Sequence, residues 1–225
     1  MSAPEFTDRR DAGRQLARAL THLRSQSPLI LALPRGGVPV AFEVAAALDA
    51  ELDLLFVRKL GAPGHPEFGI GAVVDGADPQ MVVNEAAARQ LNVSTGYLRA
   101  ELARQLDEID RRRHAYVGAR PAVPIAGRTV IVVDDGIATG GTVAAALAGV
   151  RRNHPGRLVL AVPVAPPEAA AALRPHCDEL ICLETPDPFY AVGAHYADFT
   201  QTGDAEVIDL LARAAAAHGT TRHPA

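Results

Sequence analysis

Several residue types are scarce in this 225-residue chain, and their scarcity excludes whole classes of protein. There is no tryptophan, and the two cysteines, Cys177 and Cys182, form no CxxC motif. A zinc site or a disulfide framework is therefore not expected, and buried free thiols in a reducing compartment are the simpler interpretation. The chain has four serines and no Gly-x-Ser-x-Gly sequence, which argues against a serine hydrolase.

Excess positive charge and long apolar runs are also lacking. The formal net charge is −4 and the pI is near 6.0, whereas a dedicated nucleic-acid binder usually carries a basic face. The one basic run, Arg111 to Arg113, is interleaved with acidic residues at helical spacing, which favours a solvated helix face. No apolar run approaches membrane-spanning length, and the first residues contain no apolar signal-peptide core. We expect a cytoplasmic protein with neither a nucleic-acid nor a membrane partner.

Apolar and amphipathic segments alternate along the chain, which predicts an α/β fold. The apolar segments lack polar alternation, so we expect strands buried on both faces of a parallel sheet that helices flank. The expected strands are residues 29–33, 52–57, 130–133, 158–164 and 180–183. We predict a single domain over residues 1–225, with a core of about 29–183 and a C-terminal helix of about 204–217.

The segment between the second and third of these strands is expected to be less regular. Residues 61–67 are too rich in glycine and proline for regular structure, which predicts a loop. Residues 69–74 and 81–83 have the pattern of a β-hairpin, and residues 94–117 that of a long amphipathic helix.

The run VIVVDDGIATGGT, residues 130–142, is the most informative stretch of the sequence. A buried strand ends at two adjacent carboxylates, Asp134 and Asp135, and a small-residue turn then leads into an alanine-rich helix. Backbone N–H groups at a helix N-terminus bind phosphate, and glycines let the backbone approach it closely. The carboxylates can accept hydrogen bonds from two sugar hydroxyls, directly or through a hydrated Mg²⁺. The run predicts a site for a phosphorylated sugar, and a plain strand-to-helix turn capped by the aspartates is the alternative.

This run resembles the phosphoribosyl-pyrophosphate (PRPP) signature of type I phosphoribosyltransferases, and the whole chain is similar to the stand-alone bacterial members of that family. The resemblance implies a type I phosphoribosyltransferase-like parallel sheet with a small hood subdomain, formed by N-terminal residues and residues of about 184–203. Mg²⁺ is the implied cofactor, held by the two aspartates through water or the ribose. Ribose and phosphate binding is assigned to Asp134, Asp135, Gly136, Ile137, Ala138, Thr139, Gly140, Gly141 and Thr142.

A second loop also follows a strand and opens a helix, and it contains Arg35, Gly36 and Gly37. The resemblance assigns pyrophosphate to this loop, where exposed glycine N–H groups and a bidentate arginine suit that role. Arg58 and Lys59 are expected at the C-terminal end of the next strand, where ligand crevices of α/β proteins open, and they would add two cations. A tight turn with a solvent-facing arginine and a structural salt bridge are the alternatives.

Residues 61–69 occupy the place of the family's mobile loop, which closes over the reacting centre. Its ionisable residues are His65 and Glu67. Adenine-type members share the Ala-Thr-Gly-Gly-Thr run that begins at Ala138 and take an acid from the mobile loop. By that resemblance Glu67 is the candidate general base and His65 the second, while a solvated loop residue is the alternative for both.

Four of the chain's ten aromatic residues lie within residues 189–199. Phe189 and Tyr190 are candidates for stacking on a planar acceptor, although a hood core would use the same residue types.

The sequence thus predicts the transfer of 5-phosphoribosyl from PRPP to a nitrogen nucleophile, a nucleobase or a related heterocycle, with release of pyrophosphate. The expected partners are PRPP and a small-molecule acceptor, and a homo-oligomer is compatible with the sequence. The alternative is a non-catalytic protein of the same fold that senses PRPP or nucleotides.

Overall fold

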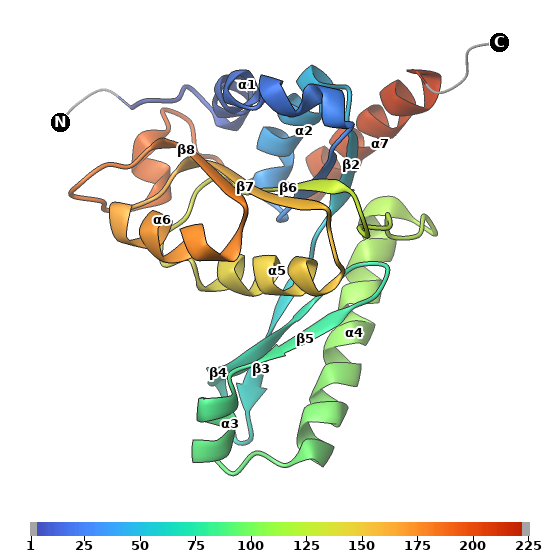
Figure 1. Cartoon of the computed structure of the whole chain (residues 1–225), viewed down its shortest axis with the longest axis vertical. Helices are drawn as coiled ribbons and strands as arrows, with labels where there is room; N and C mark the ends of the chain where they lie inside the picture. The colour runs from blue at the N-terminus through green and yellow to red at the C-terminus, as the bar shows by residue number, and fades with distance from the viewer. Residues whose placement is uncertain (1–3, 222–225) are drawn as a thin grey trace.

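A computed structural model describes residues 4–221, and for residues 66, 67 and 219–221 it describes the backbone alone. Five parallel strands form the central sheet in the order β2-β1-β6-β7-β8 (Figure 1). The strands are β1 (Leu29–Ala32), β2 (Glu51–Leu54), β6 (Thr129–Val133), β7 (Arg157–Val164) and β8 (Glu179–Glu184). The predicted α/β fold with a parallel sheet is therefore confirmed.

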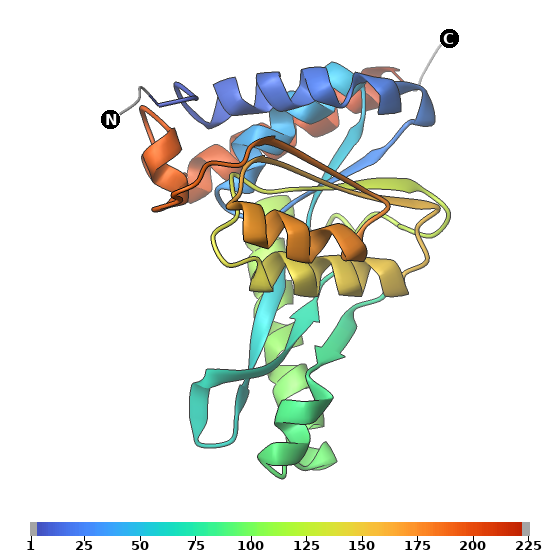
Figure 2. The ribbon, with the colours of Figure 1, turned by 60° about the vertical axis from the view of Figure 1, so that its left-hand side comes forward.

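Helices cover both faces of the central sheet (Figures 1 and 2). The helices are α1 (Arg9–Ala19), α2 (Gly37–Leu48), α5 (Gly141–Arg152), α6 (Pro167–Leu173) and α7 (Asp204–Thr221). Successive residues of a strand point to opposite faces, so Ile30 and Ala32 of β1 pack with α1, α2 and α7. Leu29 and Leu31 pack on the other face, with α5 and α6. Both faces of β1 are therefore core, which is why all four of its residues are apolar.

Several helices begin where the sequence supplies a capping side chain. Asp8 accepts a hydrogen bond from the N–H of Asp11 at 2.7 Å, as expected for a cap of α1. Ser94 caps the long helix α4 (Thr95–Val117), and Asn84 caps the short helix α3 (Glu85–Gln90), which the sequence did not predict. Each such cap contributes about 1 kcal/mol. Three short 3₁₀ helices complete the described helical elements: η1 (Thr21–Gln26), η2 (Arg174–His176) and η3 (Val192–His195).

Residues 57–117 extend away from the central sheet, and we call this segment the arm (Figure 2). It contains α3, α4 and an antiparallel sheet of β3 (Val57–Ala62), β4 (His65–Val74) and β5 (Gln80–Val83). The predicted hairpin and long helix are confirmed. The prediction of a loop over residues 61–67 is wrong, because β3 and β4 pair as far as Ala62 and His65. Gly64 turns the hairpin with a φ of +73°, which glycine adopts without steric cost.

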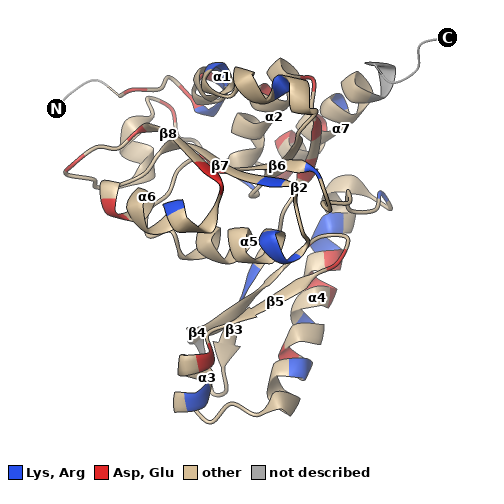
Figure 3. Cartoon of the chain, in the orientation of Figure 1, with Lys and Arg blue, Asp and Glu red and all other residues tan. Residues whose placement is uncertain are grey.

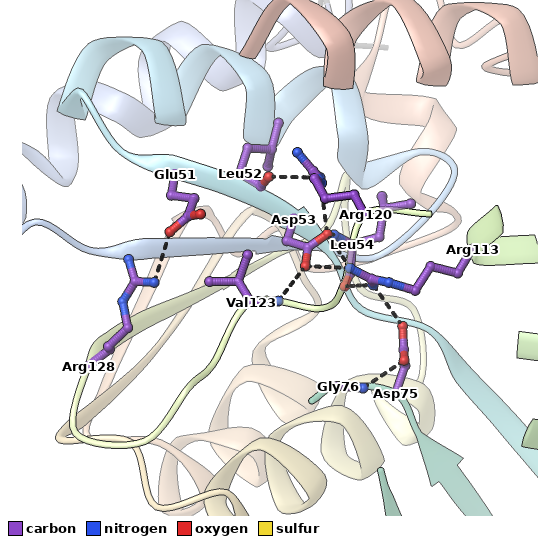
Figure 4. A network of polar contacts seen from close by, with 10 residues as sticks. All are labelled: Glu51, Leu52, Asp53, Leu54, Asp75, Gly76, Arg113, Arg120, Val123 and Arg128. Carbon is purple, nitrogen blue, oxygen red and sulfur yellow. Dashed lines mark hydrogen bonds and ion pairs between the residues drawn. The ribbon is translucent and has the colours of Figure 1, made fainter. Parts of the chain in front are cut away.

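A buried network of charged side chains joins the arm to the central sheet (Figure 4). Arg113 of α4 donates to both oxygens of Asp53 in β2, at 2.6 and 2.8 Å, and to Asp75 at 3.1 Å. Arg120 donates to Asp53 at 3.3 Å. The predicted solvated helix face is wrong for Arg113, because this guanidinium neutralises two carboxylates that are removed from water. Burial raises the pKa of Asp75 above its usual range despite the nearby Arg113.

The N-terminal residues and residues 184–203, which we predicted to form the hood, pack against each other. Phe6 pairs with Tyr196 as an isolated β-bridge, and their ring centroids lie 5.3 Å apart. The N–H of Phe6 donates to the carbonyl of His195 at 3.0 Å. The boundaries of the hood stay a prediction. Within residues 4–221, no helix is both long enough and apolar enough to cross a membrane.

Candidate functional site

A cleft of about 710 Å³ opens at the carboxyl edge of the central sheet, beside the base of the arm. Ligands of α/β proteins commonly bind at this edge, because loops that follow several parallel strands meet there. Arg35 lines the cleft from the loop after β1, and Asp134 from the end of β6. Arg58 of β3 and Thr142 of α5 also line it. The structure therefore brings together residues of all three sequence segments that we predicted to bind PRPP.

The two adjacent carboxylates after β6 face different surroundings. Asp134 lines the cleft, and its Oδ1 accepts the N–H of Asp135 at 2.9 Å. Burial and the neighbouring Asp135 carboxylate raise the pKa of Asp134 well above its usual range. Asp135 instead accepts a hydrogen bond from Nε of Arg9 at 2.7 Å, and its carbonyl accepts one from the hydroxyl of Tyr196 at 2.5 Å. One carboxylate is thus directed to the cleft and the other to the N-terminal helix.

Arg9 was not among the site residues that the sequence predicted. Its Nη1 donates to the carbonyl of Thr200 at 2.7 Å, and its guanidinium lies 3.8 Å from the ring centroid of Phe199. The partners of Arg9 are 126 and 191 positions away in the chain, so local patterns contain no signal for these contacts. The ion pair with Asp135 reduces the net charge of the acidic pair.

The loop after β1 packs directly on the acidic pair, as we expected for two loops of one site. A Cβ atom on Gly36 would lie 2.1 Å from Oδ2 of Asp135, and one on Gly37 would lie 2.8 Å from the carbonyl oxygen of Val133. Both positions therefore require glycine because of close approach. The predicted exposed N–H is wrong for Gly37, because this residue is buried and its N–H donates to the carbonyl of Leu33 at 3.0 Å. The Pro34–Arg35 peptide bond is cis.

The glycine- and threonine-rich loop leads into the N-terminus of α5. Gly140 precedes the helix with a φ of +79°, a conformation that favours glycine. The first intrahelical hydrogen bond runs from the N–H of Ala144 to Gly140, so the N–H groups of the first three helical residues have no carbonyl within the helix to accept them. Ala138, Thr139, Gly141 and Thr142 are exposed, while Ile137 is buried. This geometry suits a bound phosphate.

We predicted Arg58 and Lys59 at the C-terminal end of a strand. This prediction is wrong, because both residues lie near the beginning of β3. Consecutive strand residues point to opposite faces, and of these two only Arg58 is among the described residues that line the cleft. Its Nε donates to Oε1 of the buried Gln105 at 2.9 Å, and Nε2 of Gln105 donates to Glu101 at 2.9 Å. A buried amide therefore fixes the direction of the Arg58 side chain.

The remaining predicted residues are absent from the described lining of the cleft. His65 is exposed next to the turn of the β3–β4 hairpin, and the side chain of Glu67 lies outside the description. Phe189 stacks on His195, with centroids 5.4 Å apart, while Tyr190 is 84% exposed.

The aromatic residues that do line the cleft are Phe56 and Tyr116, which the sequence analysis missed. Their rings stack with centroids 6.1 Å apart and planes 11° apart. They lie sixty residues apart on different elements, so only the folded chain brings them together.

The comparisons with known proteins agree with this architecture. The sequence profile of the phosphoribosyl transferase domain family matches residues 81–198, which include the acidic pair and the loop into α5. This match covers more than half of the chain, so the chain belongs to the phosphoribosyl transferase domain family.

Two curated Mycobacterium tuberculosis proteins, from strains CDC 1551 / Oshkosh and H37Rv, are provisionally named phosphoribosyl transferases. Each is 46% identical to this chain over 209 residues, which is 93% of the chain. The chain spans 47% of the length of these relatives. The crystal structure of TT1426 from Thermus thermophilus is similar with a TM-score of 0.81 and 46% identity, over 93% of this chain and 98% of that one.

Proposed function

We propose that this protein transfers 5-phosphoribosyl from PRPP to a nitrogen nucleophile and releases pyrophosphate. The observation that carries the proposal is that the loops after β1 and β6 meet at one cleft, which Arg35, Asp134 and Thr142 line together. Such a cleft offers an anion-binding helix N-terminus, hydroxyl acceptors and cations within the span of one phosphorylated sugar.

In this proposal the 5′-phosphate binds at the N-terminus of α5, at Thr139 to Thr142, where the helix dipole favours negative charge. Asp134 accepts a ribose hydroxyl from within the cleft. Asp135 contributes with its second oxygen, because its Oδ2 is engaged by Arg9. Arg35 and Arg58 neutralise the pyrophosphate as it departs and C1 gains oxocarbenium character.

The described residues fit Mg²⁺ in one way only. No group of three or more His, Cys, Asp or Glu residues within the described part of the chain could hold a metal ion. Mg²⁺ often needs only one or two carboxylates when substrate phosphates supply the other oxygens, and Asp134 would meet that requirement in its ionised form, which a bound cation favours. Bound in this manner, Mg²⁺ would supply charge neutralisation for the pyrophosphate.

Glu67 and His65 stay our proposed acid–base residues. His65 is absent from the described lining of the cleft, so it would act there only after a movement of the β3–β4 hairpin. A general base contributes typically about 10²–10⁴-fold. With an identified acceptor, we expect Glu67→Gln to lower turnover by roughly two orders of magnitude and to leave PRPP affinity nearly unchanged. Near-normal turnover of this variant would remove Glu67 from the mechanism and leave His65 as the candidate.

Calorimetry with PRPP and Mg²⁺ tests the binding half of the proposal. A Cβ atom on Gly141 would meet no protein atom within 4 Å, so Gly141→Ala should leave the fold intact. It should nevertheless weaken PRPP by about tenfold, because the added methyl group stands where the phosphate approaches the helix N-terminus. Absence of PRPP binding to the wild-type protein would refute the proposal.

A PRPP- or nucleotide-sensing protein without catalytic activity is the second candidate function. It is favoured by the ion pair that engages Asp135 and by the distance of His65, at the hairpin turn, from the described lining of the cleft. Pyrophosphate release in the presence of PRPP and a panel of nucleobases separates the two. Tight PRPP binding without release under any acceptor supports the sensor.

A further inference from the structure

The cleft contains cations beyond those that our proposed pyrophosphate site uses. Arg111 and Arg112 of α4 line it from the side of the arm. The charged residues that line the cleft are Arg35, Arg58, Arg111, Arg112, Asp134 and Asp204. Four arginines thus face two aspartates in a space that also has to hold the acceptor. Figure 3 shows basic residues at the end of α4 that lies nearest the central sheet.

We infer that Arg111 and Arg112 form an anion subsite, and that the acceptor is a planar ring that carries its own carboxylate or phosphate group. This inference rests on the proposed function and adds the chemical class of the acceptor to it.

The two guanidinium groups are held in place by one carboxylate. Arg111 donates to Glu108 from Nε at 2.9 Å and from Nη2 at 3.0 Å, and Arg112 donates to it from Nε at 2.6 Å. These bonds lower the pKa of Glu108 to about 2, so the carboxylate stays ionised at any working pH. Exposed ion pairs of this kind contribute little to stability. Their effect here is to orient two cations towards the cleft, with further N–H donors left over on each guanidinium.

The ring wall lies one helical turn from this subsite. Arg112 and Tyr116 are four residues apart in α4 and therefore lie on the same face of the helix. Tyr116 stacks on Phe56, and Leu55 and Ile208 extend the apolar lining. An apolar wall with a few convergent polar groups is typical of small-molecule sites. A ring against Tyr116 places a substituent on its edge within reach of Arg112.

Asp204 offsets part of the positive charge of the cleft. Its carboxylate accepts the hydroxyl of Tyr116 at 2.7 Å and Nη1 of Arg35 at 3.2 Å. Asp204 also lies close enough to Arg112 for that cation to help lower the pKa of its carboxyl. Asp134, Asp204 and Glu108 are thus three carboxylates beside four arginines, so an excess of positive charge remains. A neutral acceptor would leave this local excess of positive charge desolvated, while an anionic acceptor neutralises it.

Matched probes test the inference without knowledge of the natural acceptor. We would titrate benzoate against benzamide, and phenyl phosphate against phenol, into the protein saturated with pyrophosphate, and follow the ligand signals by NMR. The wild-type protein should bind one of the charged probes at least roughly tenfold more tightly than its neutral partner, as expected for hydrogen bonds to a charged group. The pair with the larger preference identifies the acidic group.

The variant Arg111→Gln/Arg112→Gln should reduce this preference to within about twofold. Its control is Arg151→Gln/Arg213→Gln, which removes the same charge from two partly exposed arginines that also pair with carboxylates but lie elsewhere. The control should keep the preference. Equal binding of charged and neutral probes to the wild type, or no binding of any probe, would overturn the inference.

Pyrophosphate affinity, measured on the same samples, separates two kinds of failure. If pyrophosphate weakens in Arg111→Gln/Arg112→Gln as much as the charged probe does, the two arginines belong to the pyrophosphate site and the inference is wrong. If PRPP does not bind the wild-type protein at all, it is the proposed function that fails.

Discussion

The strands of the central sheet and the strands of the arm differ in how deeply they are buried. All four residues of β1 are buried, whereas all four residues of β5 are only partly buried. Strands covered on both faces hold their loops rigidly, and the central sheet contributes the closely packed loop around Gly36 and the acidic pair. The arm contributes the cations Arg58 and Arg112. The ion pair between Arg113 of α4 and Asp53 of β2 fastens the arm to the sheet. The cleft exists because these two regions meet, so changes to their junction should have the largest effects.

The first prediction concerns that junction. Arg113→Met should destabilise the protein by about 3–5 kcal/mol, because it leaves two buried carboxylates without their shared cation. Those carboxylates, Asp53 and Asp75, are 1% and 4% exposed. Urea denaturation measures the loss. Arg213 pairs with Asp209 and both side chains are exposed, so it is the control, and Arg213→Met should cost no more than about 1 kcal/mol. Equal, small losses in both variants would show that the network does not fasten the arm.

The second prediction concerns the rigidity of the central sheet's loops. Gly36→Ala forces a Cβ atom to within 2.1 Å of Oδ2 of Asp135, a short side chain that Arg9 also holds. Relief of this overlap should cost about 1–3 kcal/mol of stability. PRPP binding should weaken at the same time, because both loops must shift. Gly141→Ala, with open space around its Cβ, should keep wild-type stability. If Gly36→Ala melts like the wild type, the two loops are less closely packed than the structure indicates.

The strands of the central sheet could be predicted from the sequence more completely than those of the arm. The strands of the central sheet could be predicted because a short apolar run without polar alternation is typical of a strand buried on both faces. The position of the acidic pair could be predicted with them, because the pair directly follows β6. The β3–β4 hairpin could not, because Gly61, Pro63 and Gly64 are typical of loops when strand pairing is unknown. The local sequence does not show which strands pair when tertiary packing stabilises their pairing.

Site residues that depend on long-range contacts were missed for the same reason. Arg9 reaches Asp135 across 126 positions, and the stacking of Phe56 on Tyr116 depends on how α4 lies against the sheet. Phe189 and Tyr190 were chosen because aromatic residues cluster in the sequence, but clustering in sequence does not place a ring at the cleft. Arg111 and Arg112 are exposed, as the interpretation of the basic run as a solvated face predicted, but that interpretation did not consider that an exposed helix face can also line a cleft.

The third prediction concerns the pH dependence of stability that Asp134 causes at the edge of the central sheet. Burial and Asp135 raise the pKa of Asp134 well above its usual range, so ionisation of Asp134 weakens the folded state. The stability of the wild type should therefore fall as the pH rises through the folded-state pKa, and Asp134→Asn should escape this loss. The advantage of the variant should be absent near the ordinary aspartate pKa of about 3.9 and grow above it.

Urea denaturation of both proteins over a pH series measures this difference, which should be accompanied by weaker PRPP binding. Asp178→Asn provides a control of opposite sign, because a hydrogen bond from Arg151 lowers the pKa of Asp178. Removing that ionised group should cost stability at neutral pH and progressively less as the pH falls. Parallel stability curves for the wild type and Asp134→Asn would contradict the assigned direction.

The smallest expected effect lies within the arm, at the amide that directs Arg58. Gln105→Leu removes the acceptor of the Arg58 Nε bond at 2.9 Å. The guanidinium then samples more orientations, and the pyrophosphate affinity should fall by about fivefold, in keeping with the roughly 1 kcal/mol net value of a hydrogen bond. Tyr97→Phe is a matched control, because it removes another hydrogen bond of the arm, to the carbonyl of Gly61 at 2.9 Å, in which Arg58 takes no part. A double-mutant cycle decides whether Gln105 acts through Arg58: in an Arg58→Gln background, Gln105→Leu should have no further effect on pyrophosphate affinity. A full additional fivefold loss in that background would mean that Gln105 supports the site by another route, such as the packing of α4 on β3.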